Sequence, residues 1–505
     1  MRYEFTSIVE EEYRRDFNMQ LNPIGGFAVL IISAIVMIPL AIWFNQKGSK
    51  TSDDFMTARE SVSNIMAMAS LMATWIWAST LLGSAEGGYQ FGATALWTYA
   101  AILPISAVIG IPVIKRARQM MPNASTFPEI VGKRIGSKGH AIFTFVAIAQ
   151  MFFFGVVNIM AVGLILNAMF GMSHWQTVII AGAIITIYIA IGGVRAAIIT
   201  GSVQVVAMVI LLILIMPITI FKVGGPSAIY QGLAASGVPT ATTIISKDTV
   251  TGWLLISWGG YIMYTFINSE VWQKVFAVKQ GEESKLILGS TLLWVPIPCV
   301  AGIIGMIGLA QGLNLQGSEV MPAVFLKLMP PWVTYFVVVI LLASIFSTVS
   351  TCLSACSTIF VNDIFKPLQK KLLSLQGYND KQVLRLAKVS VLFFGLLMTF
   401  IGTGNFSILF FTYAIGALAV PITWPFVISI LMKRINTRAI FLGMIIGILA
   451  SIYFVFLPEI GAIENPVPLW QGYWITHAIS GVIPLIGCLL WPKNEEPQQL
   501  ETRVI

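Results

Sequence analysis

The chain has 505 residues, of which 57% are apolar and 10% are charged, and its mean hydropathy is +0.84. Soluble domains carry about 25% charged residues, so this composition excludes a soluble globular protein and indicates a membrane protein. The apolar runs are continuous rather than alternating, which excludes a transmembrane β-barrel. The net charge of +8 does not indicate nucleic-acid binding, because the Lys and Arg residues fall in short segments between the apolar runs.

The apolar runs are long enough to cross about 30 Å of hydrocarbon as helices. We therefore expect an all-α polytopic membrane protein with about 13 transmembrane helices. In chain order the expected spans cover residues 25–45, 62–88, 94–114, 140–170, 174–194, 197–222, 250–278, 285–312, 331–362, 384–403, 405–432, 437–457 and 468–492.

Positive charge is unevenly distributed over the segments between these spans. Alternate segments contain basic stretches such as "KRARQ" and "KRINTR", whereas those between them hold almost no Lys or Arg. Basic loops remain on the cytoplasmic side of a membrane. We therefore expect residues 1–24 to lie outside the cell, residues 493–505 to form a cytoplasmic tail, and the protein to reside in the plasma membrane.

The second span contains a stretch that is unusually polar for a membrane helix. This stretch, "ATWIWASTLLGSAEGGYQFG" (Ala73 to Gly92), interrupts an apolar run with Ser, Thr, Glu and four Gly residues. Irregular backbone is tolerated at membrane depth only where protein or a water-filled cavity shelters it. The sequence therefore predicts an unwound segment here, buried inside the protein.

A similar interruption occurs five spans later, in "SWGGYIMYTFINSEVWQK" (Ser257 to Lys274). Two copies of a five-helix unit, each beginning with a broken helix, lie inverted in the membrane because five is an odd number. We therefore expect a 5+5 inverted-repeat transporter core. The expected units are a first helix and loop over 25–61, repeats over 62–222 and 250–432, and two further helices over 437–492.

The ninth span carries a row of hydroxyl groups. Ser and Thr side chains recur there at steps of three and four residues and so share one helix face: Ser344, Ser347, Thr348, Thr351, Ser354 and Thr358. Small hydroxylated residues also serve simple helix packing, and that alternative stays open. Together with carbonyls freed by the broken second span, these hydroxyls would form an all-oxygen site for Na⁺.

Aromatic and polar side chains gather at the predicted breaks. Flat rings with a polar handle can stack on a small planar solute. The candidate solute-binding residues are Trp75, Trp77, Thr80, Trp258, Tyr261, Asn268, Glu270 and Tyr413. Glu270 has an alternative role, an ion pair with Lys274 one helical turn later. No catalytic constellation is present, so the sequence predicts neither an enzyme nor a cofactor, and no obligate protein partner is evident.

Residues 50–435 resemble the sodium/solute symporter family, whose core is APC/LeuT-like. The resemblance rests on "SIFST" (Ser344 to Thr348), "ATWI" (Ala73 to Ile76), "TFPEIVGKRIG", "YIAIGGVRAAIITGSVQ" and "NSEVWQKVFAVK", in this order and spacing. It implies a Na⁺ site formed by the hydroxyls of Ser347 and Thr348 and the carbonyls of Ala73, Ile76 and Ser344. Within the family, "TWIWASTLLGSAEGGYQFG", "VWQKVFA" and "IGALAVPITWPF" look closest to the urea active transporters.

The chain departs from the family pattern at Gly201, where the family commonly has an acidic residue. That carboxylate is associated with cation handling, so its replacement leaves the coupling ion and the stoichiometry open. The resemblance implies cation-coupled symport, with Na⁺ as the expected ion, of a small polar solute such as urea. Alternatives are proton-coupled or uncoupled uptake of an amino acid, monocarboxylate or polyamine, and a transporter-like solute sensor.

Overall fold

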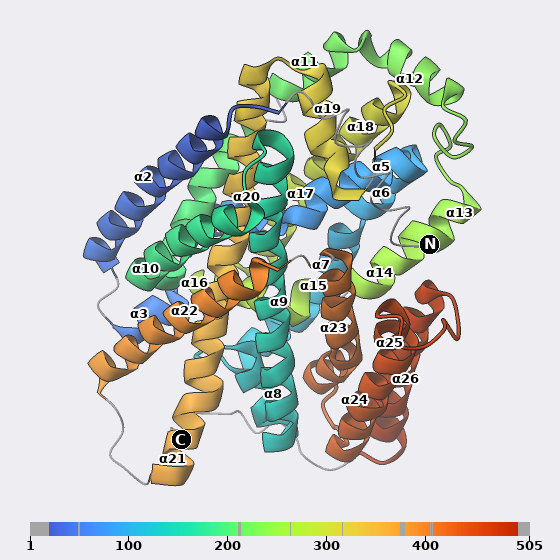
Figure 1. Cartoon of the computed structure of the whole chain (residues 1–505). Coiled ribbons are helices and arrows are strands. Elements are labelled where there is room, and N and C mark those ends of the chain that lie inside the picture. Colours follow the sequence, from blue (N-terminus) through green and yellow to red (C-terminus); the bar gives the residue numbers. More distant parts are fainter. Residues whose placement is uncertain are drawn as a thin grey trace.

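The structure, a computed structural model, describes residues 20–48, 51–210, 214–262, 264–315, 317–373, 379–404, 406 and 408–492. The expected N-terminal segment over 1–24 lies mostly outside these residues, and the expected tail over 493–505 lies wholly outside them. Within the described ranges the chain is helical and contains no β-strand. Figure 1 shows long helices packed side by side, with shorter helices at both ends of the assembly.

Eleven helical segments of the described chain are long and apolar enough to cross a membrane, and a bent pair of helices supplies a twelfth. The first part of the chain contributes α2 (Pro23–Gly48), the bent pair α4 (Asn64–Trp75) and α5 (Ser84–Phe91) with η1 (Ser79–Gly83) between them, α6 (Ala93–Ala100) with α7 (Ile102–Met120), α9 (Ser137–Phe170) and α10 (His174–Ile210). The second part begins with a broken span that consists of α13 (Lys247–Thr249), η3 (Val250–Leu254), α14 (Leu255–Tyr261), α15 (Tyr264–Ile267) and α16 (Ser269–Ala277). It continues with α17 (Glu283–Trp294) and α18 (Pro296–Ala310) as one span, α20 (Pro331–Ile359) with η5 (Phe360–Phe365), and α22 (Asp380–Gly402). The last spans are α23 (Ile408–Leu431), α24 (Thr437–Ser451) with η6 (Ile452–Phe456) and α25 (Leu457–Glu459), and α26 (Leu469–Leu490).

Helix α10 is two spans joined by a sharp turn at Gly193. The first residue of α10, His174, contacts the carbonyl oxygen of Gly402 at the end of α22. Further along α10, Gly193 lies against the carbonyl of Phe55 on α3 (Ser52–Thr57). The φ of +58° at Gly193 is one that only glycine adopts readily, and a Cβ atom there would collide with the Phe55 carbonyl. When the two halves of α10 are counted separately, the described residues contain 13 candidate spans, the number expected from the sequence.

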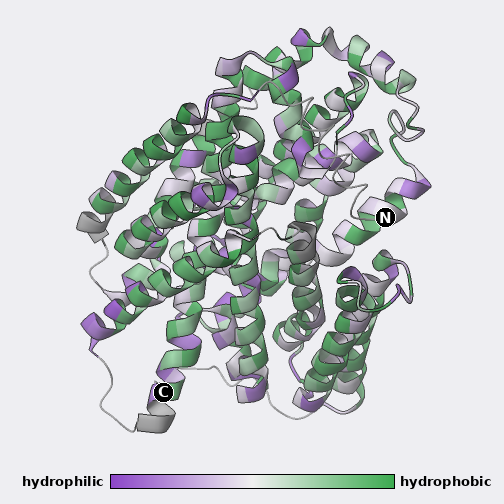
Figure 2. Cartoon of the chain, viewed as in Figure 1, coloured by the Kyte–Doolittle hydropathy of each residue, from purple (hydrophilic) through white to green (hydrophobic). Residues whose placement is uncertain are grey.

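The remaining short helices cap the two ends of the assembly. One end carries α3 (Ser52–Thr57), α8 (Phe127–Ile135) and α21 (Lys366–Leu373), and the other carries α11 (Met216–Lys222), α12 (Gly225–Ala235), η4 (Gly317–Glu319) and α19 (Val320–Leu328). We call these the α8 end and the α12 end. Figure 2 shows apolar residues over much of the long helices, with polar residues at the two ends and also at places between them.

Helix α20 lies at the centre and packs against α4, α9, α10 and α22. Its hydroxyl row is fully enclosed by these neighbours. By contrast, α22 exposes large apolar side chains such as Leu396 and Phe400, which is the pattern of a lipid-facing helix. The core of the protein is therefore organised around the hydroxyl-rich helix.

Helices α5 and α18 cross at very short range because their contact is made of glycine. A Cβ atom on Gly305 would overlap the carbonyl oxygen of Ala85, and one on Gly88 would overlap that of Gly302. Close approach through small residues is a common basis of helix packing in membranes. This contact fixes α5, the second half of the broken span, against the rest of the protein.

Candidate functional site

The second span is unwound between α4 and η1, as the sequence predicts. Helix α4 ends at Trp75, Ile76 has a non-helical backbone (φ −88°, ψ 66°), and the chain resumes as η1 and α5 with a bend of 62°. The break is deeply buried, with Ala73, Trp75 and Ile76 each at most 2% exposed. We refer to residues 73–78 as the α4 break.

Side chains from other helices satisfy the backbone groups that the α4 break frees. The Ala78 amide donates to the side-chain oxygen of Asn158 on α9 at 3.0 Å. The carbonyl of Trp75 accepts from the Thr80 hydroxyl at 2.9 Å and from the Trp294 indole at 3.0 Å. Such partners are what irregular backbone requires at this depth. Asn158 did not emerge as a candidate from the sequence, although it is a lone amide in the apolar run "MFFFGVVNIMAVGL".

The candidate cation residues of α20 face the α4 break. The Thr348 hydroxyl donates to the carbonyl of Thr74 at 3.0 Å and lies 3.2 Å from the carbonyl of Ser344. The Ser347 hydroxyl is buried and has no hydrogen-bond partner among the described residues. The structure therefore brings Ser344, Ser347 and Thr348 against the segment that contains Ala73 and Ile76. All these groups offer neutral oxygen atoms, which suit a hard monovalent cation.

Gly201 lies directly beside this hydroxyl cluster. A Cβ atom at this position would sit 3.0 Å from both the Ser347 and the Ser70 hydroxyl oxygens. Both hydroxyls are buried and have no hydrogen-bond partner in the described part of the chain. The position at which the sequence departs from the family pattern is thus in contact with the candidate cation residues.

Lys274 does not form the ion pair with Glu270 that helical spacing allows. Its ammonium donates instead to the hydroxyls of Thr351 at 3.0 Å and Thr74 at 3.3 Å. Glu270 is 1% exposed, and its Oε2 atom has no partner among the described residues. Asn268 accepts from the Glu270 amide and so begins helix α16. Thr74 is a contact of the candidate site that the sequence did not single out, and the sequence named Lys274 only as an ion-pair partner of Glu270.

A cavity lined mainly by aromatic side chains adjoins the α4 break. Its lining consists of Trp75, Trp77, Tyr99, Ile102, Leu103, Tyr261, Tyr264 and Trp294, with no charged side chain. The ring centroid of Trp77 lies 4.6 Å from that of Phe154 in an edge-to-face contact and 6.0 Å from the ring centroid of Tyr261. The indole nitrogen of Trp75 is buried without a hydrogen-bond acceptor in the described residues.

The structure gathers only some of the predicted solute residues at this cavity. Trp75, Trp77 and Tyr261 line it, and Thr80 supports Trp75 through its carbonyl. Trp258, Asn268 and Glu270 are not in the lining. The Trp258 indole points instead to the carbonyl of Thr98, at 2.8 Å. The side chain of Tyr413 lies outside the described residues.

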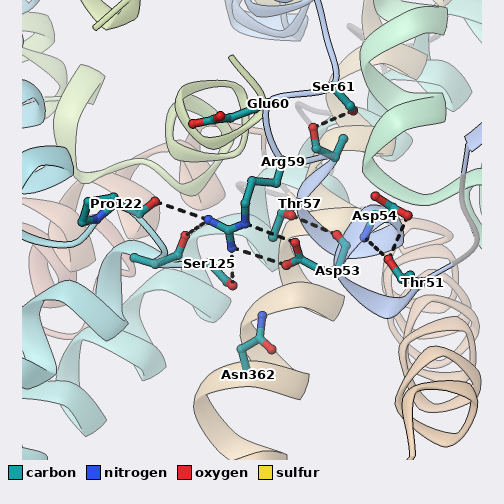
Figure 3. Close-up of polar contacts among 12 residues, drawn as sticks. Thr51, Asp53, Asp54, Thr57, Arg59, Glu60, Ser61, Pro122, Ser125 and Asn362 are labelled. Atoms are coloured by element: carbon teal, nitrogen blue, oxygen red, sulfur yellow. Dashed lines mark hydrogen bonds and ion pairs between the residues drawn. The ribbon is translucent and has the colours of Figure 1, made fainter. Parts of the chain in front are cut away.

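The α8 end is held together by Arg59, as Figure 3 shows. Its guanidinium pairs with Asp53 on α3 at 3.1 Å and donates to the Ser125 hydroxyl at 3.2 Å and to the carbonyls of Pro122 and Ala124. We call these five residues the Arg59 cluster. It fastens α3, just before the second span, to the segment that leads into α8. The residues on either side of Arg59 both have positive φ, 47° at Ala58 and 49° at Glu60, which is costly for residues other than glycine.

Comparison with known proteins identifies this arrangement. The model of the Sodium:solute symporter family matches residues 55–447. The chain belongs to this family. The chain is 25% identical over 465 residues to the probable urea active transporter 1 of Schizosaccharomyces pombe, and the match covers 85% of this chain and 68% of that protein. It is 24% identical over 518 residues to the urea-proton symporter DUR3 of Oryza sativa, which covers 93% of this chain and 70% of that protein.

The fold of the chain is also that of a solved transporter structure. That structure is described as the substrate-bound outward-open state of a Na⁺-coupled sialic acid symporter. The TM-score is 0.74 at 17% identity, with 93% of this chain and 99% of that chain covered. The chain therefore has an all-α fold with the 5+5 inverted-repeat core expected from its two broken spans.

Proposed function

We propose that this symporter uses a Na⁺ gradient to carry a small, uncharged, planar solute such as urea. The observation that supports this most directly is the cavity beside the α4 break, whose lining contains six aromatic side chains and no charged side chain. A solute with a carboxylate or an ammonium group would lose its hydration there without gaining an ionic partner, which is costly. This argues against amino acids, monocarboxylates and polyamines as solutes.

Urea matches the chemistry of this cavity. It is flat, so it can stack between rings, and its carbonyl oxygen can accept a hydrogen bond from the buried indole nitrogen of Trp75. A few polar groups on largely apolar walls, here indole nitrogens and the hydroxyls of Tyr99, Tyr261 and Tyr264, can orient such a solute without binding it tightly. The names of the fission-yeast and rice relatives, which both refer to urea, support the same solute class.

For the coupling ion, we assign Na⁺ to the oxygen atoms between the α4 break and α20. The carbonyls of Ala73, Ile76 and Ser344 and the hydroxyls of Ser347 and Thr348 are the proposed ligands. Trp75 lies between the two α4 ligands and lines the solute cavity. An ion that fixes the backbone at Ala73 and Ile76 therefore also fixes this ring, so Na⁺ and solute each increase the affinity for the other.

We also propose an orientation of the protein in the membrane. The α8 end carries the basic segments, so we place it in the cytoplasm, with the N-terminus outside and the C-terminus inside a plasma membrane. The repeats over 62–222 and 250–432 would then rearrange around the α4 break during alternating access. The Arg59 cluster closes the cytoplasmic side and must open before Na⁺ and solute leave.

Proton coupling is the second candidate, and a specific residue favours it. Glu270 is a buried carboxyl group at the start of α16, and one of its oxygen atoms has no partner in the described residues. The rice relative is named a urea-proton symporter. A carboxyl group in such a place can carry a proton, so the test of function must separate the two ions.

The test is uptake of radiolabelled urea into proteoliposomes with either a Na⁺ gradient or a pH gradient imposed. We expect uptake by the native protein to follow the Na⁺ gradient and uptake by Ser347→Ala to be lost. Ser390→Ala is the matched control, because Ser390 is a buried hydroxyl on α22 that bonds to Ser357 and Ala387. Uptake that follows only the pH gradient selects the proton candidate. Uptake that ignores both gradients refutes symport and leaves the facilitator or sensor alternative.

A further inference from the structure

A second cluster of oxygen atoms lies next to the proposed Na⁺ ligands, and a lysine occupies it. The hydroxyls of Thr74 on α4 and Thr351 on α20 are 3.3 Å apart. Each lies within hydrogen-bonding distance of a carbonyl of its own helix, Ser70 at 2.8 Å and Ser347 at 3.1 Å. When each hydroxyl hydrogen is used in this way, both lone pairs are left to accept bonds from the Lys274 ammonium.

The position of this ammonium is not explained by an ordinary ion pair. Lys274 is completely buried, as are Thr74 and Thr351 to within 1%. The ion pairs of the described residues do not include Lys274. A buried charge without a directly bonded counter-ion is costly at membrane depth. The direct bonds of the ammonium are to two neutral hydroxyls, as those of a monovalent metal ion would be, and the carboxyl group of Glu270 is a nearby acidic neighbour that does not contact it.

The ammonium is close enough to the proposed Na⁺ site to act on it. Thr351 follows Thr348 by three residues, which is a rise of about 4.5 Å along the helix. Thr74 follows Ala73 directly. Two unit charges about 5 Å apart at an effective dielectric constant of about 20 repel each other enough to change binding on the order of a hundredfold. Gly201, beside Ser347, supplies no carboxylate to offset this repulsion, which leaves Glu270 as the acidic group that acts on Lys274.

We propose that Lys274 is a resident cation of the symporter. Its ammonium occupies the Thr74–Thr351 cluster in place of a second metal ion, weakens the binding of Na⁺ at the neighbouring site, and limits that pair of sites to one Na⁺ in each transport cycle. The weakened binding favours release of Na⁺ into the cytoplasm. This inference rests on the proposed coupling to Na⁺ and assigns Lys274 as a residue that sets its affinity and stoichiometry.

The test is direct binding of radioactive Na⁺ to the purified full-length protein, read as the dissociation constant and the number of ions bound. We expect one ion on the native protein and at least tenfold tighter binding by Lys274→Gln and Lys274→Met, which remove the charge and keep most of the side-chain length. Lys274→Ala, which also vacates the cluster, is expected to bind two ions. Lys274→Arg keeps the charge and should keep the native affinity.

The outcomes separate this inference from the proposed function. If the native protein shows no saturable Na⁺ binding, Na⁺ coupling itself is wrong. If the native protein binds Na⁺ but both neutral variants bind it equally or more weakly, Lys274 is only a structural anchor and the inference is overturned. Thermal unfolding of each variant identifies those that fold, and the Gln and Met variants provide two independent chances to remove the charge.

Discussion

Asn158 offers a demanding test of how the α4 break is held open. Its side-chain oxygen accepts the Ala78 amide at 3.0 Å, and its side-chain nitrogen donates to the carbonyl of Phe154 at 2.8 Å, all in a fully buried setting. Asn158→Ala would leave the Ala78 amide unsatisfied, which costs about 1–3 kcal/mol. Because the broken conformation bears this cost, we expect Na⁺ and solute to bind about 5- to 150-fold more weakly.

The assay is Na⁺ binding and urea uptake measured on the same preparations. Asn167→Ala is the matched control, since Asn167 is an amide on the same helix whose side chain bonds to the carbonyl of Met172, away from the break. The control should keep native Na⁺ affinity even if it is slightly less stable. Native Na⁺ and urea affinities in Asn158→Ala would refute the view that this amide maintains the break.

Three further predictions concern the rest of the fold. Arg59→Ala should speed hydrogen exchange of backbone amides in α3 and in residues 122–126 several-fold, and Arg59→Lys should not restore protection because it lacks the planar fork; unchanged exchange would contradict the role of the Arg59 cluster. Gly305→Ala should lower stability by about 1–3 kcal/mol through overpacking, measured by thermal unfolding, whereas Gly252→Ala, whose Cβ would meet its nearest atom at 3.7 Å, should not. Burial raises the pKa of Glu129 above its ordinary value, so the folded form retains a proton after the unfolded chain has released it. The stabilisation present at low pH is therefore lost as pH rises from the ordinary pKa of a glutamate to the raised pKa of Glu129. The unfolding temperature of Glu129→Gln should lack this pH dependence.

The order of the spans and the places where they break could be predicted from sequence. Apolar runs of about 20 residues directly indicate membrane helices. Polar or glycine-rich interruptions indicate an unwound segment inside the protein, because unpaired backbone groups are not tolerated in lipid. The hydroxyl face of α20 follows from helical periodicity alone. The turn at Gly193 was expected only as a boundary between two spans, although its positive φ explains why glycine stands there.

The partners of individual side chains could not be predicted, because they come from distant parts of the chain. Spacing along α16 brings Glu270 and Lys274 to one face, yet Lys274 bonds to hydroxyls that are 200 and 77 residues away. Trp258 sits beside a break but turns its indole toward Thr98 on the neighbouring span. Asn158 carries no motif, and only the folded structure places it at the α4 break.

The central claim, that Na⁺ bound at the α4 break prepares the aromatic cavity for solute, is tested most directly by equilibrium binding. The dissociation constant of radiolabelled urea should be measured on purified protein in Na⁺ and in choline, and that of Na⁺ with and without urea. We predict that Na⁺ tightens urea binding and that urea tightens Na⁺ binding by the same factor, as linkage requires. Equal urea affinity in Na⁺ and choline, on protein that binds both ligands, would contradict the account.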